Sequence, residues 1–417
     1  MLMFLRRQRV HLRRTYEDYP RSFWILVLAT FIDSLGGFLL FPFMSLYITQ
    51  KFGVGMTEVG FLFGLFSISN TAGGLVGGAL TDRIGRKSIV VFGLVTSALI
   101  ALILGVIGTF ELFAVAVLVV GIFASMGGPA RQSMVADLLP EERRAEGFGI
   151  LRVTFNVSAT VAPAVAGILA ARSYLLLFVT DAVISLVTAV IVMAMLPETR
   201  PALHMGVERE SVLSTFRGYF TVLRDSVFVM FGAICMLMAL VYMQINTTMG
   251  VYLRDVHGIS TQGYGYLLSA NAIMVVLLQF SFTRRVKKIP PFLAMALGTA
   301  LYAIGFGAFG FMTTYAMFLW AMVVITIGEM VVAPISQALV ARMAPEDMRG
   351  RYNAVFGFTW VVPGIVGPLL AGLVMDNLDP RWVWYAAGLI GLVAALGFVG
   401  MHRRVPQATP APREAAV

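Results

Sequence analysis

Long apolar segments alternate with short polar connections along nearly the whole chain. The apolar segments cover residues 23–48, 58–80, 88–108, 112–136, 146–170, 173–196, 228–254, 261–283, 291–312, 315–341, 351–375 and 382–401. Most of them match the roughly 20 residues that a helix needs to cross the hydrocarbon core of a bilayer. The pattern predicts an all-α membrane protein with 12 transmembrane helices and little chain left for a soluble domain.

Composition agrees with a membrane protein and disfavours an enzyme. Of the 417 residues, 59% are hydrophobic and 13% are charged, whereas about a quarter of residues are charged in soluble domains. The four histidines are scattered over connections and tails: His11, His204, His257 and His402. They provide neither a metal cluster nor a base for a serine nucleophile. The single cysteine, Cys235, lies in a predicted span and is expected to be a packing residue. We therefore expect no enzyme activity, no metal and no cofactor.

Basic residues are concentrated on one side of the predicted membrane. The connections expected inside, with the two ends of the chain, hold 25 of the 31 lysines and arginines. The outward connections keep only Lys51, Arg172, Arg254 and Arg381. Because cytoplasmic loops carry the excess of basic residues, both termini are predicted to be cytoplasmic. The net charge of +9 then favours contact with anionic membrane lipids over nucleic-acid binding.

The chain repeats itself after a shift of 205 residues. The shift aligns Tyr47, Gly53, Gly60, Pro163 and Gly167 with Tyr252, Gly258, Gly265, Pro368 and Gly372. Because each half has an even number of spans, the halves are predicted to be parallel repeats related by a pseudo-two-fold axis along the membrane normal. We predict a basic cytoplasmic arm over 1–22, a six-helix bundle over 23–196, a cytoplasmic linker over 197–227, a second six-helix bundle over 228–402 and a cytoplasmic tail over 403–417.

A charged turn joins the second and third predicted spans. It reads Gly78-Ala79-Leu80-Thr81-Asp82-Arg83-Ile84-Gly85-Arg86-Lys87. An acid beside a glycine turn and a basic pair, where a helix leaves the bilayer, can form a charge latch that a moving bundle makes and breaks. The residues predicted to form this inner gate are Gly78, Asp82, Arg83, Gly85, Arg86, Lys87, Asp137, Arg143 and Arg144. Such a latch favours a transporter that changes shape over a static pore.

Asp33, Asp181 and Glu329 lie inside predicted spans. An ionised carboxylate is costly in hydrocarbon, so such groups face a cavity, form a pair or take up a proton. We predict that Asp33 and Glu329 couple transport to protons; the alternative is a neutral acid held by a hydrogen bond between helices. For Asp181 we favour a packing role. Arg131 and Arg152 either supply counter-charges or belong to the inner gate.

Polar, aromatic and soft side chains at mid-span are the candidate substrate contacts. They are Phe38, Asn70, Asn156, Tyr242, Met243, Gln244, Asn246, Asn271 and Tyr302. Aromatic and methionine side chains form adaptable apolar surfaces, and the spans lack the density of polar residues that a sugar would need. Pro42, Pro163 and Pro368 are predicted to kink their helices.

The pattern resembles the major facilitator superfamily over essentially the whole chain, and within it the twelve-span drug:proton antiporters, including tetracycline and multidrug efflux proteins. The segment from Gly78 to Lys87 is similar to the superfamily's signature between spans two and three. Asp33-Ser34-Leu35-Gly36, followed by Phe41-Pro42 and Tyr47, resembles the first-span pattern of the antiporter branch.

Three positions depart from the antiporter pattern. In the fifth span, Ala162-Pro163 stands where the signature has Gly-Pro. Ile122 takes the place of an arginine thought to assist proton transfer in many relatives, and Arg284 takes the place of an acid in the second-half loop. Only the latch of the first half is therefore intact.

The resemblance implies a proton-coupled secondary transporter of the bacterial inner membrane that exports lipophilic or cationic small molecules by alternating access. Its expected partners are the substrate, protons and anionic lipids, with the proton gradient as energy source and a monomer as the expected state. A lipid or metabolite exporter or flippase of the same fold is the alternative. A non-transporting receptor or scaffold is a third interpretation, which leaves the mid-span acids and the latch without a purpose.

Overall fold

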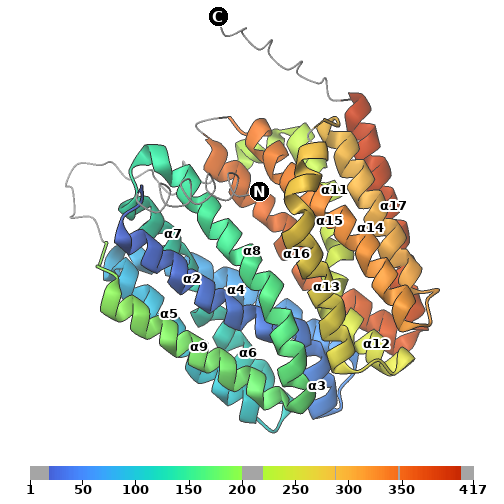
Figure 1. Cartoon of the computed structure of the whole chain (residues 1–417), viewed down its shortest axis with the longest axis horizontal. Helices are drawn as coiled ribbons and strands as arrows, with labels where there is room; N and C mark the ends of the chain where they lie inside the picture. Colours follow the sequence, from blue (N-terminus) through green and yellow to red (C-terminus); the bar gives the residue numbers. More distant parts are fainter. Residues whose placement is uncertain (1–17, 200–218, 287, 346–347, 405–417) are drawn as a thin grey trace, which may run out of the picture. The chain divides into compact units, whose positions relative to one another are not determined.

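In the computed structural model of the chain, the described residues are 18–199, 219–286, 288–345 and 348–404. Every regular element within them is a helix, and none is a strand (Figure 1). The described residues contain 12 segments that are long and apolar enough to cross a membrane. The predicted all-α fold with 12 spans is therefore confirmed.

The first six spans begin and end close to their predicted limits. Their elements are α2 (Arg21–Leu40), η1 (Phe41–Phe43), α3 (Met44–Phe52), α4 (Met56–Ile84), α5 (Arg86–Val106), α6 (Phe110–Ser125), α7 (Gly127–Leu138), α8 (Glu141–Arg172) and α9 (Tyr174–Met195). The first span combines α2, η1 and α3, and the fourth combines α6 and α7. At Pro42 the α-helix gives way to a 3-10 turn, because proline has no amide hydrogen to donate. Pro163 lies inside a continuous α8.

The last six spans follow the same plan. Their elements are α11 (Ser226–Thr247), α12 (Met249–His257), α13 (Thr261–Val286), α14 (Pro291–Phe309), α15 (Tyr315–Met343), α16 (Arg349–Asn377) and α17 (Arg381–Arg404). The span predicted over 228–254 differs, because the helix breaks at Thr248 between α11 and α12. Two consecutive β-branched residues favour such a break, and the carbonyl of Thr247 accepts a hydrogen bond from the Ser45 hydroxyl at 2.5 Å. Pro368 lies within α16.

The described residues form two compact units. Unit one holds residues 18–199, 245–273 and 368–373, and unit two holds the described residues of 219–244, 274–367 and 374–404. Residues 219–224, in the predicted linker, form a short helix. Residues 1–17, 200–218 and 405–417, which include most of the predicted arm, linker and tail, lie outside the described part of the chain. The predicted domain boundaries stay a prediction.

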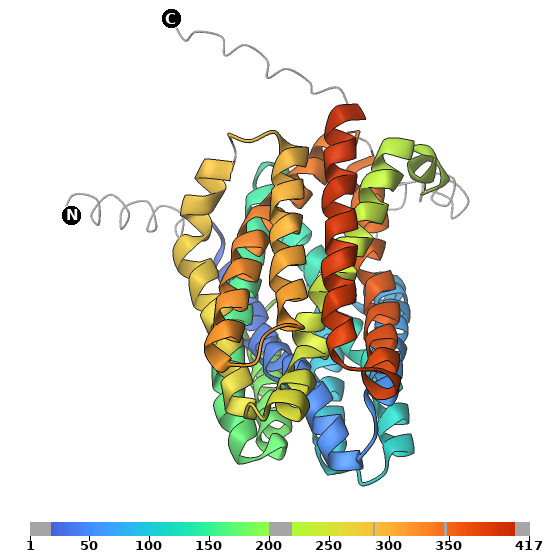
Figure 2. The same cartoon turned by 90° about the vertical axis from the view of Figure 1, so that its right-hand side faces the viewer.

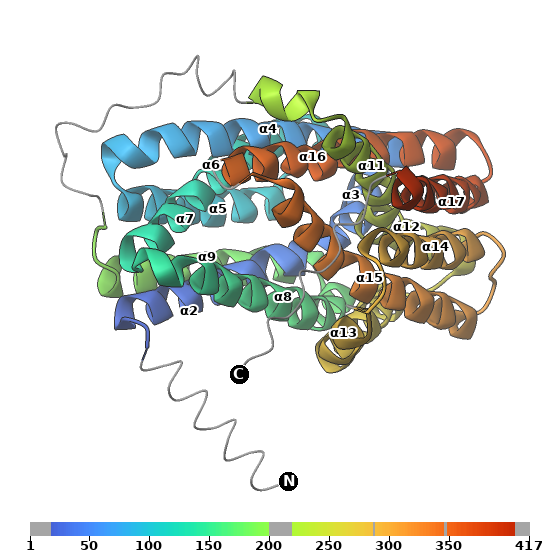
Figure 3. The same cartoon turned by 90° about the horizontal axis from the view of Figure 1, so that it is seen from above.

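In unit one, α2 packs against both α8 and α9, while α5 lies along α9 and α4 lies along α6 (Figures 1 and 3). Phe23 and Leu26 of α2 are completely buried, as are Met134 and Val135 of α7. These four side chains belong to one apolar core. That core fixes α2 beside α7, the two helices that carry Asp33 and Arg131.

In unit two, α14 packs against α15 and α17 (Figure 2). Trp384 of α17 is fully buried, with its ring centroid 4.9 Å from that of Phe309 and 6.4 Å from that of Phe306. Phe318 of α15 lies 5.1 Å from Phe309, and Tyr302 lies 6.0 Å from Phe306. These ring contacts fix α14 against α15 and α17 and thereby fix the position of Tyr302 in α14.

The predicted sequence repeat has a counterpart in local geometry. Helices α3 and α12 both end at a glycine in the left-handed region, Gly53 with φ 66° and Gly258 with φ 64°. Glycine adopts this conformation without the strain that a β-carbon brings. Since the same 205-residue shift relates the two positions, the shift that aligns the sequence halves also aligns two helix ends.

Helix crossings within unit one depend on a second pair of repeat-related glycines. A β-carbon at Gly60 of α4 would lie 2.5 Å from Cα of Leu369 in α16, and one at Gly265 of α13 would lie 2.8 Å from Cα of Gly167 in α8. Small residues let helix backbones approach closely in lipid, where packing replaces the hydrophobic drive between helices. Both crossings are therefore closed to larger side chains.

We predict that Gly60→Ala and Gly265→Ala each destabilise the protein by about 1–3 kcal/mol, the usual cost of forcing atoms into a filled site. The loss should occur although alanine is the better helix former. Thermal unfolding of the purified protein in detergent measures it. The matched control is Gly74→Ala in α4, which meets open space and should not lower the midpoint. Wild-type midpoints for both crossing variants would contradict this account of the packing.

Candidate functional site

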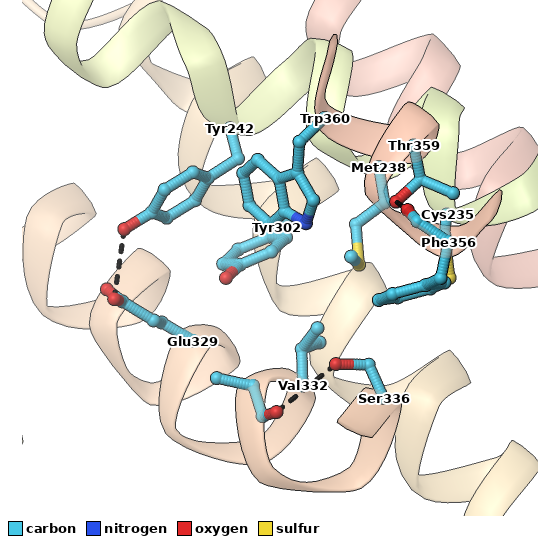
Figure 4. A pocket seen from close by; sticks show the side chains of 11 residues that line it. Cys235, Met238, Tyr242, Tyr302, Glu329, Val332, Ser336, Phe356, Thr359 and Trp360 are labelled. Carbon is cyan, nitrogen blue, oxygen red and sulfur yellow. Dashed lines mark hydrogen bonds between the residues drawn. The ribbon is translucent and has the colours of Figure 1, made fainter. Parts of the chain in front are cut away.

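Unit two contains a cavity of about 100 Å³ built by α11, α14, α15 and α16 (Figure 4). The described residues that line it are Cys235, Met238, Tyr242, Tyr302, Glu329, Val332, Ala333, Ser336, Phe356, Thr359 and Trp360. Among them, Glu329 is the only acid and no basic residue is present. The cavity thus combines one ionisable carboxyl group with a mostly apolar wall.

Two glycines bring α14 and α15 together beside this acid. A β-carbon at Gly328 would lie 2.7 Å from the carbonyl oxygen of Gly298 and 3.0 Å from the ring of Tyr302. Close approach of the two helices therefore sets Tyr302 next to the residue that follows Gly328, which is Glu329. From α11, the Tyr242 hydroxyl donates a hydrogen bond to Oε1 of Glu329 at 2.9 Å (Figure 4).

Three aromatic rings line the same cavity as the Glu329 carboxyl group. The Tyr242 ring centroid lies 5.6 Å from that of Tyr302 and 6.0 Å from that of Trp360, to which it is nearly perpendicular at 89°. Aromatic faces attract cations through their negative quadrupole. An acid among such rings can hold an organic cation, or a proton in its place.

The remaining hydroxyl groups of the wall are already engaged. Ser336 donates to the carbonyl of Ala333 at 3.2 Å, and Thr359 donates to the carbonyl of Phe356 at 2.7 Å. Local bonds of this kind satisfy a hydroxyl within its own helix. The polar chemistry of the cavity therefore rests on Glu329, the two tyrosines and the indole N–H of Trp360.

The other predicted coupling acid lies in unit one. Asp33 of α2 forms an ion pair with Arg131 of α7, and both side chains are partly buried. Of the two predicted counter-charges, Arg131 thus contacts a transmembrane acid, whereas Arg152 is exposed. Asp181 of α9 is 7% exposed.

Arg86 and Asp137 connect the signature turn to α7. Gly85 joins α4 to α5 with φ 116°, a conformation that other residues rarely adopt. Arg86 is buried, and its Nε lies 3.1 Å from Oδ2 of Asp137. The Glu198 carboxylate accepts hydrogen bonds from the backbone amides of Arg86 and Lys87 at 2.8 and 3.2 Å. Glu198 thereby supplies a negative charge at the start of α5, where the helix dipole favours one.

Arg143 belongs to a different contact group of unit one. Its guanidinium lies 3.5 Å from Oδ1 of Asp18 and 5.7 Å from the centre of the Tyr19 ring. The Tyr19 hydroxyl donates to Glu146 of α8 at 2.8 Å. Burial raises the pKa of Tyr19, and this hydrogen bond adds to the shift. The described contacts do not join Arg143 to Asp137, so the single gate cluster expected from the sequence is divided.

The other predicted gate residues make fewer contacts. Arg144 donates from Nε to the carbonyl of Leu139 at 3.2 Å, which ties it to the end of α7. Arg83 is exposed. A β-carbon added at Gly78 would lie 3.8 Å from Cβ of Pro129, an ordinary contact distance. The side chain of Asp82 lies outside the described part of the structure. Its pairing stays a prediction.

Two of the predicted substrate contacts, Tyr242 and Tyr302, line the Glu329 cavity. The others do not belong to its described lining: Phe38, Asn70, Asn156, Met243, Gln244, Asn246 and Asn271. Phe38 packs edge-on against Phe155 with ring centroids 4.8 Å apart. Asn70 and Asn156 are exposed.

Sequence reasoning missed several residues that line the Glu329 cavity, and it missed Glu198, which caps the start of α5. Trp360 had a readable signal, because tryptophan is enriched at membrane interfaces and this one lies near the middle of its span. Met238 and Phe356 resemble ordinary apolar residues of a span, and no local pattern sets them apart. Cys235, expected to be a packing residue, is buried and also lines the cavity. Glu198 follows the last helix of the first half, far in sequence from the turn that it caps.

A model of the Major Facilitator Superfamily matches residues 26–367 and 294–416. The chain belongs to the Major Facilitator Superfamily. This transporter is 26% identical over 415 residues to a Na(+), Li(+), K(+)/H(+) antiporter of Planococcus maritimus, which covers 92% of this chain and 96% of that protein. It is 23% identical over 394 residues to the multidrug resistance protein MdtH of Salmonella paratyphi B, with 92% and 95% covered.

The solved structures support the same fold. The nucleoside transporter NupG matches with a TM-score of 0.77 at 14% identity, covering 91% of this transporter and 100% of that chain. At this identity the likeness concerns the fold alone. The protein is thus a multi-pass membrane transporter with the superfamily's helical architecture.

We predict an energetic coupling of about 1–2 kcal/mol between Arg86 and Asp137 in a double-mutant cycle with alanine. The pair is close and Arg86 is buried, and hydrogen bonds to charged groups in such positions are the strong ones. Thermal unfolding of the wild type, both single variants and the double variant measures the coupling. The matched control is the more exposed pair of Asp18 and Arg143, whose coupling should stay below about 1 kcal/mol. Equal coupling in the two pairs would count against a special role for the signature turn.

Proposed function

We propose that this transporter exports lipophilic cations in exchange for protons, by alternating access. The observation that carries the proposal is Glu329: among the described residues that line its aromatic cavity it is the only acid, and none of them is basic. A cation and a proton both neutralise this carboxyl group, so each competes with the other. The 23% identity to a multidrug resistance protein supports export of drug-like molecules.

The cavity size favours a particular mode of binding. Drug-sized pockets enclose about 300–1,000 Å³, whereas this cavity encloses about 100 Å³. We therefore infer that it receives the cationic head of a larger molecule. Trp360 and Tyr302 would face the head group with their rings, while the Glu329 carboxylate supplies the opposite charge.

Exchange follows from the Tyr242 hydrogen bond. With no cation bound, the phenol donates to Glu329 and limits the cost of a buried carboxylate. A cation from the inner side takes over the charge and is carried outward. A proton from the outer side then binds the Glu329 carboxylate and displaces the cation. When the cavity opens to the inner side again, this proton is released there. Asp33, neutralised by Arg131 in unit one, is the second proposed coupling acid.

The inner gate and the orientation belong to the same proposal. The contact of Arg86 with Asp137, supported by Glu198, is its best-defined latch. The excess of basic residues in alternate connections supports cytoplasmic termini, and the bacterial relatives support a bacterial inner-membrane location. Anionic lipids would contact these connections, and a monomer suffices because the cavity is formed by one chain.

Exchange of Na⁺, Li⁺ or K⁺ for protons is the second candidate function. Its support is the 26% identity to the antiporter of Planococcus maritimus over 92% of this chain. Alkali cations are hard and are held best by several oxygen ligands, as carboxylate, carbonyl and water provide for other hard cations. The described lining offers one carboxyl group and aromatic hydroxyls, which suits an organic cation better.

We predict that Glu329→Gln weakens the apparent affinity for tetraphenylphosphonium about 10- to 100-fold, since a charge-assisted contact contributes roughly 1.5–3 kcal/mol. Proteoliposomes with an imposed pH gradient should move tetraphenylphosphonium together with protons. Both Glu329→Gln and Asp33→Asn should lose the coupled proton flux. Glu111→Gln, an exposed acid in the first turn of α6, is the matched control and should behave as wild type.

The same proteoliposomes separate the alternatives. Proton flux driven by Na⁺ or K⁺ without an organic cation would favour alkali-cation exchange. Movement of a labelled phospholipid that ignores tetraphenylphosphonium would favour a lipid exporter or flippase. Normal coupled flux in both acid variants would rule out the proposed mechanism.

The only cysteine of the chain gives a second test without an engineered background. Cys235 lines the Glu329 cavity, so methyl methanethiosulfonate should modify it more slowly when tetraphenylphosphonium is bound. We expect at least a several-fold lower rate, measured by mass spectrometry. Cys235→Ser should take up no label. A rate that does not respond to saturating cation would show that the cation binds elsewhere.

A further inference from the structure

Asp181 has the most unusual surroundings of the acids within the described spans. It is the only charged residue of α9, a helix of 22 residues, and is only 7% exposed. Its neighbour Ala182 packs with Ala98 and Ala101 of α5. An ionised carboxylate in such a position is expensive unless a cation or several donors neutralise it.

The carboxyl group of Asp181 reaches α2 through a gap left by a glycine. A β-carbon added at Gly36 would overlap Oδ1 of Asp181. Gly36 lies in a regular part of α2 and has no positive φ, so its missing side chain provides space and not backbone freedom. Gly36 follows Asp33 by three residues, which places both positions on one side of the helix. Asp181 is thus directed at the part of α2 that carries Asp33.

No described hydrogen-bond donor or cation neutralises Asp181. The charged group that acts on it is Asp33, whose own charge is taken up by Arg131. The helices with the most extensive packing against α9 are α2, α5 and α8. Tyr47 of α3 also packs on Phe178 of α9, but its hydroxyl donates to the carbonyl of Leu104, and Lys51 donates to that hydroxyl and to the carbonyl of Gly105.

The charged residues of α5, Arg86 and Lys87, stand in its first turn, about three helical turns from Ala98. In α8, Arg152 is the charged residue nearest Ser158, which bonds to α2, and Arg152 is exposed.

We propose that Asp181 is a second proton-binding residue of the transport cycle, in exchange with Asp33. While Arg131 occupies Asp33, the proton stays on a carboxyl oxygen of Asp181. When the ion pair opens, the proton moves from that oxygen to a carboxylate oxygen of Asp33 and the charge moves to Asp181, so this transfer leaves the total charge of the three groups unchanged. Burial makes the charge on Asp181 costly, and it lasts only until the next proton binds there. The proposal rests on the role of Asp33 in the proposed function.

A proton fits this place better than a metal cation. Hard cations need several oxygen ligands, whereas the described contacts of Asp181 offer only the neighbouring Gly36 of α2 and Asp33, an acid already paired with Arg131. Two acids close together cannot both ionise without a counter-charge, so one proton is shared between them. Arg131 then decides which of the two carries the charge.

Infrared spectroscopy of the purified full-length protein tests the proton on Asp181 directly, without a substrate. At neutral pH the wild type should show the C=O stretch of a protonated carboxyl group that is lost in Asp181→Asn and displaced in Asp181→Glu. The band should shift within minutes of transfer to D₂O, as expected of a proton that exchanges with water. Gly36→Ala should displace the band, because it forces the carboxyl group away from α2. The matched control Gly37→Ala meets open space and should leave the band unchanged.

Transport gives the second measurement. With tetraphenylphosphonium as probe and a pH dye inside proteoliposomes, Asp181→Asn should lower the number of protons moved per cation by about one. Superimposable infrared spectra of the wild type and Asp181→Asn would overturn the proposal, as would a band that does not shift in D₂O. An unchanged proton ratio in Asp181→Asn would overturn it while leaving the proposed export function intact. If the wild type moves no organic cation, the export function fails, and the infrared result still decides whether Asp181 binds an exchangeable proton.

Discussion

An acid held inside an apolar helix bundle must have its charge neutralised, and this requirement shapes both units of the transporter. Glu329 receives a hydrogen bond from Tyr242, and Asp33 is paired with Arg131. Asp181 has neither kind of partner among the described residues. A phenol leaves a carboxylate more readily than a guanidinium does, so the three acids differ in how easily a cation or proton can reach them. Which of the three acids can exchange its partner for a cation or a proton depends on that difference.

The positions of these acids depend on side chains that are missing. At Gly328 and Gly298 two helix backbones approach closely enough for Tyr302 to stand beside Glu329, and at Gly36 the gap admits Asp181. Because packing in lipid has to replace the hydrophobic drive between helices, such gaps fix helix positions. The same residues that let the helices pack therefore also set the surroundings of the ionisable groups.

The sequence was sufficient for the number of spans, because length and apolarity decide whether a helix can cross a bilayer. It also singled out Glu329 and its two tyrosines, although nothing in the pattern showed that they share one cavity. Contacts between distant segments were out of reach: Glu198 caps a helix that begins more than a hundred residues earlier. The break at Thr248 was missed, since an apolar run hides a local change of backbone. The sequence suggested Arg131 as a counter-charge but could not show that its partner is Asp33.

One consequence concerns Cys235, whose thiol stands in the same wall as Glu329. A thiol is a soft nucleophile once it loses its proton, and under the proposed function molecules of many kinds would reach that wall. Cargo that bears an electrophilic centre would risk alkylating the carrier that handles it. Alkylation of Cys235 by transported compounds would then limit which electrophilic compounds a cell can export by this route.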